Sequence, residues 1–452
     1  MKLSQLITIV AGLMIIFSSY ISSASIISNQ IQKQKEQIIS KEAPSTDIKI
    51  QQILDTIDDK LVEGYLVDLV TIGQRYTGTY GCEKAAEYIY NQFSQMGLEL
   101  RYHYWEDWGP LWEKRLFSDK IFWIPHFFKS KNVEATLPGI KNDTKDEILI
   151  FNAHYDTVRY TVGANDDGSG IAGVLAAAYA LSQHEFNRTI KFVTFSGEEI
   201  HLLGSKAYAK EQYEKDANIL FEFNADMIGK ASDDYNATRM GIGATEDGHW
   251  VLDIFQDLTE KYDINFQFHR YSVSRNLGRG WSDYFHFITF GYESICIWES
   301  EGDPNMHTPQ DTLDNVNFSY LANTTRHIAG TLAILGDKED IHPQIRIANP
   351  KKGRLFYEDF EIKKLRLNKT IVLDDTLICT EITKGKTPIE KVEFYYDGKL
   401  MSTIEEPPYQ WRLNERSFGI KKKIVKVIAY DELGRTTEDE VLLRYTNLIK
   451  KR

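Results

Sequence analysis

Residues of types that bind metal ions follow an apolar run in the first half of the sequence. The run Ile148–Phe151 is typical of a buried strand, and His154 follows it closely. A glycine-containing stretch with Asp156, Asp166 and Asp167 then leads into an alanine-rich helix pattern. Charged side chains are rarely fully buried unless they are paired or bound to metal, and zinc accepts imidazole and carboxylate when it keeps a position open for water. The stretch therefore predicts a metal site rather than a polar surface loop.

Later segments offer the same chemistry in the same kind of position. The predicted strand Thr189–Phe195 ends in the vicinal pair Glu198 and Glu199. Asp226 lies at the end of the next apolar strand, and His307 follows far downstream. A lone pair of glutamates or a lone histidine would be weak evidence, but ligands gather at the carboxyl ends of strands in open α/β sheets. The conjunction predicts an α/β fold with one metal site at its strand ends.

The order of these motifs is that of a known family. HxD, GxNDDGSG, SGEE, NxDMIG and a late MHTPxDT resemble the secreted di-zinc aminopeptidases, metallopeptidase family twenty-eight, which also includes glutaminyl cyclases and some carboxypeptidases. The resemblance runs from about Arg75 to Leu335 and includes a leading helix pattern between Arg75 and Leu98. It implies a zinc-exopeptidase-type fold, a mostly parallel sheet flanked by helices.

The resemblance also implies a role for each ligand-type residue. His154 and Asp226 would hold one of two zinc ions per chain. Glu199 and His307 would hold the other, and Asp166 would bridge the pair. The expected cofactor is therefore two zinc ions, which polarise a carbonyl and lower the pKa of an attacking water.

Further carboxylates are expected to support these ligands. Asp156 lies two residues beyond His154, so on an extended chain it projects to the same side and can orient the imidazole. Asp311 is expected to do the same near His307. Glu198 is left without a metal role and is the expected general base, which takes a proton from water and delivers it to the leaving amine.

The donor that would support the tetrahedral intermediate is unassigned. Some members of the family carry a tyrosine before the last histidine, where this chain has Met306. Tyr284 stands where many relatives have histidine. It is either a substitute donor that contacts substrate or an aromatic wall of the pocket, and the sequence leaves both open.

The cluster of carboxylates suits a cationic α-amine, so the predicted reaction is hydrolysis of the N-terminal peptide bond of peptides. A glutaminyl cyclase, which uses one zinc, is an alternative. A carboxypeptidase is another, and it would need a basic pocket that Arg275 or Arg279 could supply. An inactive binding protein is disfavoured because all the expected ligands and Glu198 occur together.

The first 24 residues have the layout of a secretory signal peptide. Lys2 precedes an apolar core from Leu6 to Phe17, and small residues end at Ala24. The core is short for a helix that spans a bilayer. We expect cleavage and a secreted, extracellular or cell-surface protein, with an uncleaved membrane anchor as the alternative. Residues 25–47 are a polar spacer, and the catalytic domain is expected at residues 48–340.

Strand signals and turns recur after residue 340. Val392, Phe394 and Tyr396 alternate with their neighbours, and Asp397-Gly398 is a strong hairpin signal. Residues 343–446 resemble bacterial immunoglobulin-like modules appended to secreted enzymes, which implies a β-sandwich. A passive spacer and a binding role are both open for it.

Composition excludes one class of partner. The chain has 452 residues and a net charge of −12, which argues against a sequence-independent nucleic-acid surface.

The three cysteines, Cys82, Cys296 and Cys379, are too few for a disulfide scaffold and are expected as buried thiols, although one pair could bridge after export. The tryptophan-rich stretch His103–Arg115 is expected as a lid over the site or a flap packed on the catalytic domain. The oligomeric state is not indicated.

Overall fold

The computed structural model describes residues 46–114, 121–262, 264, 266–273, 282–365 and 369–447. The expected signal peptide, nearly all of the polar spacer, and both Arg275 and Arg279 lie outside these residues. No helix within the described ranges is both long and apolar enough to cross a bilayer.

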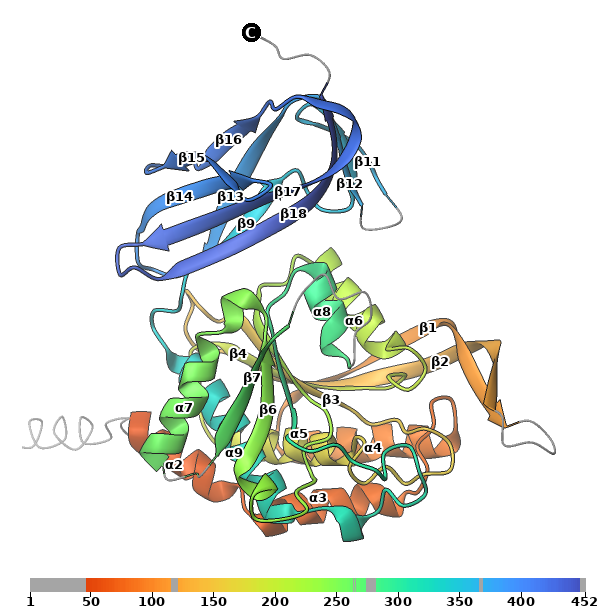
Figure 1. The fold of residues 1–452 in the computed structure, drawn as a ribbon. Coiled ribbons are helices and arrows are strands. Elements are labelled where there is room, and N and C mark those ends of the chain that lie inside the picture. The colour runs from red at the N-terminus through yellow and green to blue at the C-terminus, as the bar shows by residue number, and fades with distance from the viewer. Residues whose placement is uncertain are drawn as a thin grey trace, which may run out of the picture. The chain divides into compact units, whose positions relative to one another are not determined.

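An eight-stranded mixed sheet forms the centre of the larger part of the chain (Figure 1). Its strand order is β1-β2-β4-β3-β5-β8-β6-β7. The inner strands β4, β3, β5 and β8 run parallel, as does the pair β6 and β7, whereas β1, β2 and β6 join their inner neighbours antiparallel. The expected mostly parallel sheet is thereby confirmed. The strands are β1 (Glu99–Lys114), β2 (Ile121–Leu137), β3 (Ile148–His154), β4 (Thr189–Phe195), β5 (Ile219–Ala225), β6 (Arg239–Ala244), β7 (Gln267–Ser272) and β8 (Ser294–Glu299).

Helices cover both faces of this sheet, with α6 and α8 on one face and α3, α5 and α9 on the other (Figure 1). Helix α5 is buried on nearly every side, which explains its run of alanine and aliphatic residues. Helix α9 is 20 residues long and is also buried along much of its length. The helices are α2 (Thr46–Thr56), α3 (Asp59–Thr71), α4 (Tyr80–Gln95), α5 (Gly168–Leu181), α6 (Leu203–Glu214), α7 (Val251–Tyr262), α8 (Tyr284–Phe290) and α9 (Phe318–Asp337), with short 3-10 turns at Asn236–Thr238, Glu246–Gly248 and Leu313–Asn315.

The tryptophan-rich stretch is a strand, and its contacts agree with the flap alternative. It forms β1 and pairs along its whole length with β2 in a long antiparallel ribbon. Trp105 is buried among Tyr76 and Phe128, and its indole donates to the Ser196 hydroxyl at 3.0 Å. Trp108, three residues on, is 64% exposed. The base of the ribbon therefore packs on the catalytic domain, as the flap alternative expected, and none of the ribbon's described side chains lines the candidate site described below.

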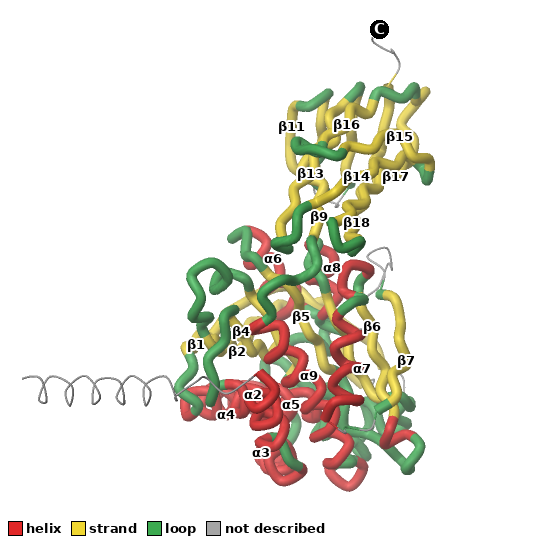
Figure 2. Tube along the Cα trace, turned by 90° about the vertical axis from the view of Figure 1, so that its left-hand side faces the viewer, coloured by secondary structure: helices red, strands yellow, loops and turns green. Residues whose placement is uncertain are grey.

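From Gln344 onward, the residues that the structure describes form strands and connecting loops only (Figure 2). A seven-stranded sheet, β11-β10-β12-β18-β17-β14-β15, and a three-stranded sheet, β16-β13-β9, share one apolar core. Asp397 and Gly398 both have positive φ and join β14 to β15, so the expected hairpin turn is confirmed. An all-β part is confirmed, whereas its immunoglobulin-like character and the domain boundaries stay predictions. The strands are β9 (Gln344–Asn349), β10 (Arg354–Tyr357), β11 (Phe360–Lys364), β12 (Thr370–Leu373), β13 (Thr376–Lys384), β14 (Ile389–Tyr396), β15 (Lys399–Ile404), β16 (Gln410–Leu413), β17 (Ser417–Asp431) and β18 (Thr436–Asn447).

The three cysteines are all free thiols. Cys82 and Cys296 are buried, as expected, whereas Cys379 is only partly buried, and no two of the three bridge.

Candidate metal centre

Three neighbouring parallel strands bring the expected ligands to one edge of the sheet. His154 is the last residue of β3, and Asp226 directly follows the last residue of β5. Glu198 and Glu199 follow β4 after a short turn. Because β4, β3 and β5 lie side by side and run parallel, their carboxyl ends meet here.

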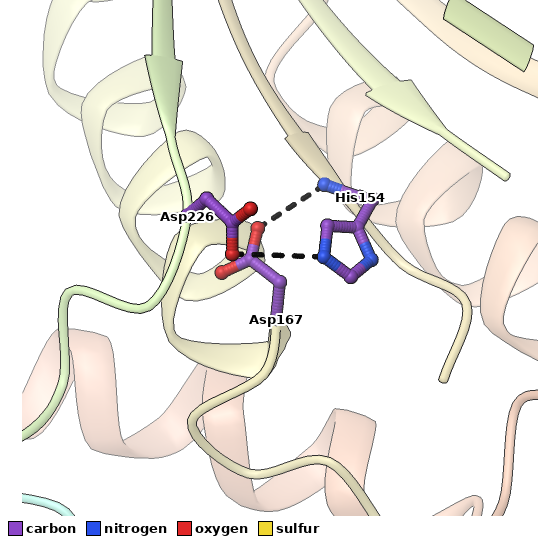
Figure 3. Close-up of side chains that lie close together, drawn as sticks. All are labelled: His154, Asp167 and Asp226. Atoms are coloured by element: carbon purple, nitrogen blue, oxygen red, sulfur yellow. Dashed lines mark hydrogen bonds and ion pairs between the residues drawn. The ribbon is translucent and has the colours of Figure 1, made fainter. Parts of the chain in front are cut away.

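The first group of donors lies around His154, which is almost fully buried. Its Nε2 atom lies 3.3 Å from Oδ1 of Asp166 and 3.7 Å from Oδ1 of Asp226. Figure 3 shows the imidazole and the Asp226 carboxylate facing each other across the ends of their strands. This group offers one imidazole nitrogen and two carboxylate oxygens.

The second group lies around His307. Its Nε2 atom is 3.0 Å from Oδ2 of Asp166 and 3.3 Å from Oε2 of Glu199. The two oxygens of Asp166 therefore face two different histidines. A carboxylate in this position can bridge two metal ions.

The spacing of these donors fits two zinc ions. Bonds of about 2.0–2.1 Å in a tetrahedral site place neighbouring ligand atoms about 3.3 Å apart. The four distances above scatter around that value, from 3.0 to 3.7 Å. In addition, Oε1 of Glu199 is buried and has no hydrogen-bond partner in the described part of the chain. A buried carboxylate oxygen without a donor fits a position that faces a cation.

The electrostatics of the cluster point the same way. Burial by itself lowers the pKa of His154, yet the charge of Glu198 and contacts with neighbouring carboxylates raise it well above its usual range. Hydrogen bonds to Asp166 and Glu199 raise the pKa of His307 to about 10. Burial, together with repulsion from nearby carboxylates, raises the pKa of Glu199 to about 7 and that of Glu198 well above its usual range. The carboxylates repel one another and call for positive charge, which protons or metal ions can supply.

Asp156 contacts His154, but chiefly through its main chain. Nδ1 of His154 lies 3.1 Å from the Asp156 carbonyl oxygen and 3.7 Å from its carboxylate. The carboxylate itself accepts from the Thr77 hydroxyl at 2.7 Å and from the backbone N–H of Glu198 at 3.2 Å. Asp156 thus orients the imidazole and also fixes the backbone that carries Glu198.

Asp311 has different partners from those expected. Its two carboxylate oxygens accept from the backbone N–H groups of Asn165 at 2.7 Å and Asp166 at 3.1 Å. Asp311 was expected to contact His307, but the carboxylates that lie next to His307 are those of Asp166 and Glu199. Asp311 therefore holds the loop that carries Asp166 rather than the imidazole of His307.

Sequence reasoning missed a role for Asp167. It accepts from the backbone N–H group of His154 at 3.2 Å (Figure 3). It also accepts from the backbone N–H groups of Gly170 at 2.9 Å and Met227 at 3.1 Å. Although it lies within reach of the first donor group, both of its oxygens are occupied by amides. It caps α5 and ties together the ends of β3 and β5. Its position before Gly-Ser-Gly at a helix start was the available signal.

Arg75 is the other residue that sequence reasoning missed. Its guanidinium is fully buried and donates to three backbone carbonyls, those of Tyr155 at 2.7 Å, Val162 at 2.5 Å and Gly163 at 2.9 Å. These carbonyls belong to the loop between β3 and α5. No local pattern marks this arginine, because its partners lie at least 80 residues away.

A cavity of about 1170 Å³ adjoins the donor groups. Tyr284, only 9% exposed, and Met306 both line it, so the two readings of Tyr284 stay open. No lysine or arginine lines the cavity within the described ranges. Its remaining described walls are largely apolar or acidic. The described lining residues are His154, Asp166, Glu198, Asn224, Asp226, Met227, Tyr271, Ser272, Val273, Ser282, Tyr284, Cys296, Ile297, Trp298, Glu299, Glu301, Gly302, Asp303, Pro304, Met306 and His307.

Comparison with known sequences gives a consistent picture. Residues 132–332 match Peptidase family M28. Aminopeptidase YwaD of Bacillus subtilis (strain 168) is 34% identical over 231 residues, which cover 49% of this chain and 48% of that protein. Leucine aminopeptidase 1 of Metarhizium robertsii is 27% identical over 232 residues, which cover 47% of this chain and 56% of that protein. The chain thus spans about half the length of these curated relatives.

Solved structures share the fold. The aminopeptidase from Aneurinibacillus sp. strain AM-1 matches with a TM-score of 0.53 at 18% identity, over 64% of this chain and 96% of that one. The zinc aminopeptidase BSAP from Bacillus subtilis gives a TM-score of 0.52 at 19% identity, over 63% of this chain and 96% of that one. At these identities the likeness concerns the fold alone.

The mixed sheet, with helices on both faces and histidines and carboxylates at its strand ends, defines an α/β fold of the zinc-aminopeptidase type. Residues 132–332 form a domain that matches Peptidase family M28. The resemblance and the fold class expected from the sequence are thereby confirmed.

Proposed function

We propose that this protein is a zinc-dependent aminopeptidase that hydrolyses the N-terminal peptide bond of peptides. Two zinc ions would be held by His154 with Asp226 and by His307 with Glu199, and Asp166 would bridge them. The observation that supports this most directly is the arrangement of Asp166, whose two oxygens face the two histidines at 3.3 and 3.0 Å.

The charge of the cluster also supports two dications. Asp166, Glu198, Glu199 and Asp226 lie together, and the pKa values of Glu198 and Glu199 are raised by burial and by repulsion from neighbouring carboxylates. Removing a carboxylate from water is costly unless a cation or several donors compensate it. Two zinc ions offset that cost more fully than two imidazolium groups can.

Glu198 is proposed as the general base. Bound zinc ions supply polarisation of the scissile carbonyl and a lowered pKa of the attacking water. Glu198 lines the cavity, and its backbone is fixed by the carboxylate of Asp156, so its side chain can take the proton of that water. Burial favours the protonated carboxyl, which can then return the proton to the leaving amine.

The described lining of the cavity suits an amino-terminal substrate. Acidic residues such as Glu198 and Asp226 can bind the α-amine. Tyr271, Trp298 and Met306 give the cavity apolar wall that can receive the first side chain.

We also propose that the enzyme acts outside the cytoplasmic membrane, on the basis of the signal-like N-terminal sequence. N-terminal sequencing of the mature protein should then begin near Ser25. Recovery of Met1 in a membrane-embedded chain would support the anchor alternative instead.

The adjacent pair Glu198 and Glu199 provides a test with an internal control. Glu198→Gln is nearly isosteric, so it should keep the bound metal and the fold but lose about 10²–10⁴-fold in turnover, the usual contribution of a positioned proton-transfer group. Glu199→Gln should lose metal as well as rate, because a neutral amide is a poor zinc ligand. Elemental analysis and turnover of an N-terminal aminoacyl reporter substrate would be measured on both variants.

Two results would contradict the proposal. Equal metal loss in the two variants, or near-normal turnover in Glu198→Gln, would mean that their roles are assigned wrongly. A single tightly bound zinc in the active parent protein would favour the glutaminyl cyclase alternative.

A further inference from the structure

The charges of this chain are unevenly divided. Residues 343–452 contain 23 lysines and arginines against 17 aspartates and glutamates, a net charge of +6. Residues 1–342 therefore carry −18, since the whole chain carries −12. Such an asymmetry is typical of chains in which one part contacts an anionic surface. The all-β part is thus a candidate for such a contact.

Part of this positive charge lies on the outer face of the seven-stranded sheet, next to apolar side chains. Strands β17 and β18 are neighbours in that sheet (Figure 1). Along them Lys422 lies opposite Arg444, and Ile424 lies opposite Leu442. The residues that alternate with these four are mostly buried in the core shared with the three-stranded sheet. The two cross-strand pairs therefore face away from the core.

The apolar members of this face are strongly exposed. Ile424 is 41% and Leu442 49% exposed, and Ile420 and Phe418, at the start of β17, are 59% and 68% exposed. Lys422, Arg444, Ile424 and Leu442 form what we call the β17–β18 patch. Phe418 and Ile420 precede it in β17, where a register shift interrupts the pairing with β18. Single exposed apolar residues are ordinary, but a contiguous group rimmed by polar residues marks an interaction surface.

The two cations of the patch are free to bind an external anion. Lys423 and Lys426, close by on β17, form ion pairs with Asp397 and Glu438. Lys422 forms no ion pair within the described part of the chain, and neither does Arg444 on β18.

From this geometry we propose that the β17–β18 patch docks the protein on an anionic lipid surface. Lysine and arginine next to such a surface are attracted to its phosphate groups, and apolar side chains between them can enter the boundary of the acyl chains. The patch is an exposed sheet face that combines both kinds of side chain, which suits a planar and fluid partner. The acidic remainder of the chain would be directed away by repulsion from the same surface.

A second copy of this chain fits the patch less well. Two copies that meet face to face through β17 and β18 would bring Lys422 and Arg444 against the same residues of the partner copy. Like charges in such an interface cost free energy, and no acidic residue stands among the four that define the patch.

The test is co-sedimentation of the full-length mature protein with lipid vesicles. One set would contain equal parts of phosphatidylglycerol and phosphatidylcholine, and the other phosphatidylcholine alone. We expect binding to the anionic vesicles only, weakening as salt is raised. Lys422→Gln with Arg444→Gln should lower the partition coefficient about 30-fold, because each basic residue near an anionic surface contributes about fivefold. Ile424→Ser with Leu442→Ser should also weaken binding.

The matched control is Lys399→Gln with Leu433→Ser, which removes an exposed cation and an apolar side chain that is 69% exposed, both away from the patch. It should bind like the parent protein. Equal binding to both kinds of vesicle, or an equal loss in the control, would overturn the proposal. So would a dimer in sedimentation equilibrium that the patch variants abolish, since the face would then belong to a second copy. Circular dichroism would verify that each variant is folded, and the charge variant tests the proposal even if the apolar variant unfolds.

Discussion

Among the residues that support the candidate metal centre, Arg75 is the one whose substitution should have the largest effect on stability. Its side chain is fully buried and donates to the carbonyls of Tyr155, Val162 and Gly163, while its backbone N–H donates to the Thr157 hydroxyl at 3.0 Å. Burial lowers the pKa of the guanidinium to about 10, although nearby carboxylates oppose that shift. The group therefore stays charged at neutral pH, at a cost that its three hydrogen bonds must offset.

Arg75→Met keeps an unbranched side chain but removes the charge and the donors. A hydrogen bond to a charged group contributes about 1.5–3 kcal/mol net, so three of them contribute at least about 4.5 kcal/mol. Relief of the burial cost of the guanidinium offsets part of this. We expect a loss of about 3–5 kcal/mol in the free energy of unfolding, the range found when one partner of a buried charge arrangement is removed. The free energy of unfolding of Arg75→Lys should lie between those of the parent and Arg75→Met. The ammonium keeps the charge, but it cannot reproduce the planar fork of donors.

The same change should weaken metal binding. The three carbonyls lie between His154 and Asp166, and groups that orient metal ligands typically contribute 10–100-fold to metal affinity. Urea unfolding of the metal-free protein would give the stability loss, and competition with a chromogenic chelator would give the zinc affinity. If Arg75→Met unfolds within about 1 kcal/mol of the parent and binds zinc equally well, Arg75 does not anchor this loop, since ordinary surface substitutions stay within such a margin.

Two further predictions concern buried carboxyl groups. Burial raises the pKa of Glu222 from 4.5 to about 8, so between these values the folded state holds a proton that the unfolded state has released. Stability should therefore fall as pH rises through this window, by an amount on the order of a few kcal/mol, and Glu222→Gln should flatten the dependence. Thermal unfolding from pH 5 to 9 tests this, and a parallel pH profile in parent and variant would count against it. Asp311→Ala leaves the amides of Asn165 and Asp166 without their acceptor, so zinc affinity should drop about 10–100-fold with the fold retained. An unchanged affinity in the chelator competition would mean that the loop holds its shape without Asp311.

The strands and the types of ligand could be read from the sequence because both are encoded locally. An apolar run of strand length followed by a polar residue predicts a strand end, and β3, β4 and β5 confirm three such ends. The gathering of His154, Asp166 and Asp226 then follows from the general position of sites in α/β sheets. The ribbon of β1 and β2 could not be read in this way, because charged residues and Gly109-Pro110 interrupt its alternation.

The supporting contacts could not be predicted, because each joins residues far apart in the sequence. Asp311 accepts from an amide 146 residues before it, and Arg75 donates to a carbonyl 88 residues after it. Asp311 lies near His307 in the sequence, which suggested that the two side chains were partners. The Asp311 carboxylate instead accepts from the backbone N–H groups of the loop that carries Asp166. Proximity in sequence is a weak guide when a buried loop must find partners for its own amides.

The loop between β3 and α5 explains why these supports matter. Most of its residues are buried but form neither helix nor strand, so its backbone groups need partners from elsewhere. Arg75 supplies donors for its carbonyls, and Asp311 supplies acceptors for its amides. Asp167, at its end, fixes the amides of neighbouring strand ends. The position of Asp166 between the two histidines is therefore imposed by side chains that need not touch metal at all. Substitutions at Arg75, Asp167 or Asp311 should alter metal binding while every ligand motif in the sequence stays intact.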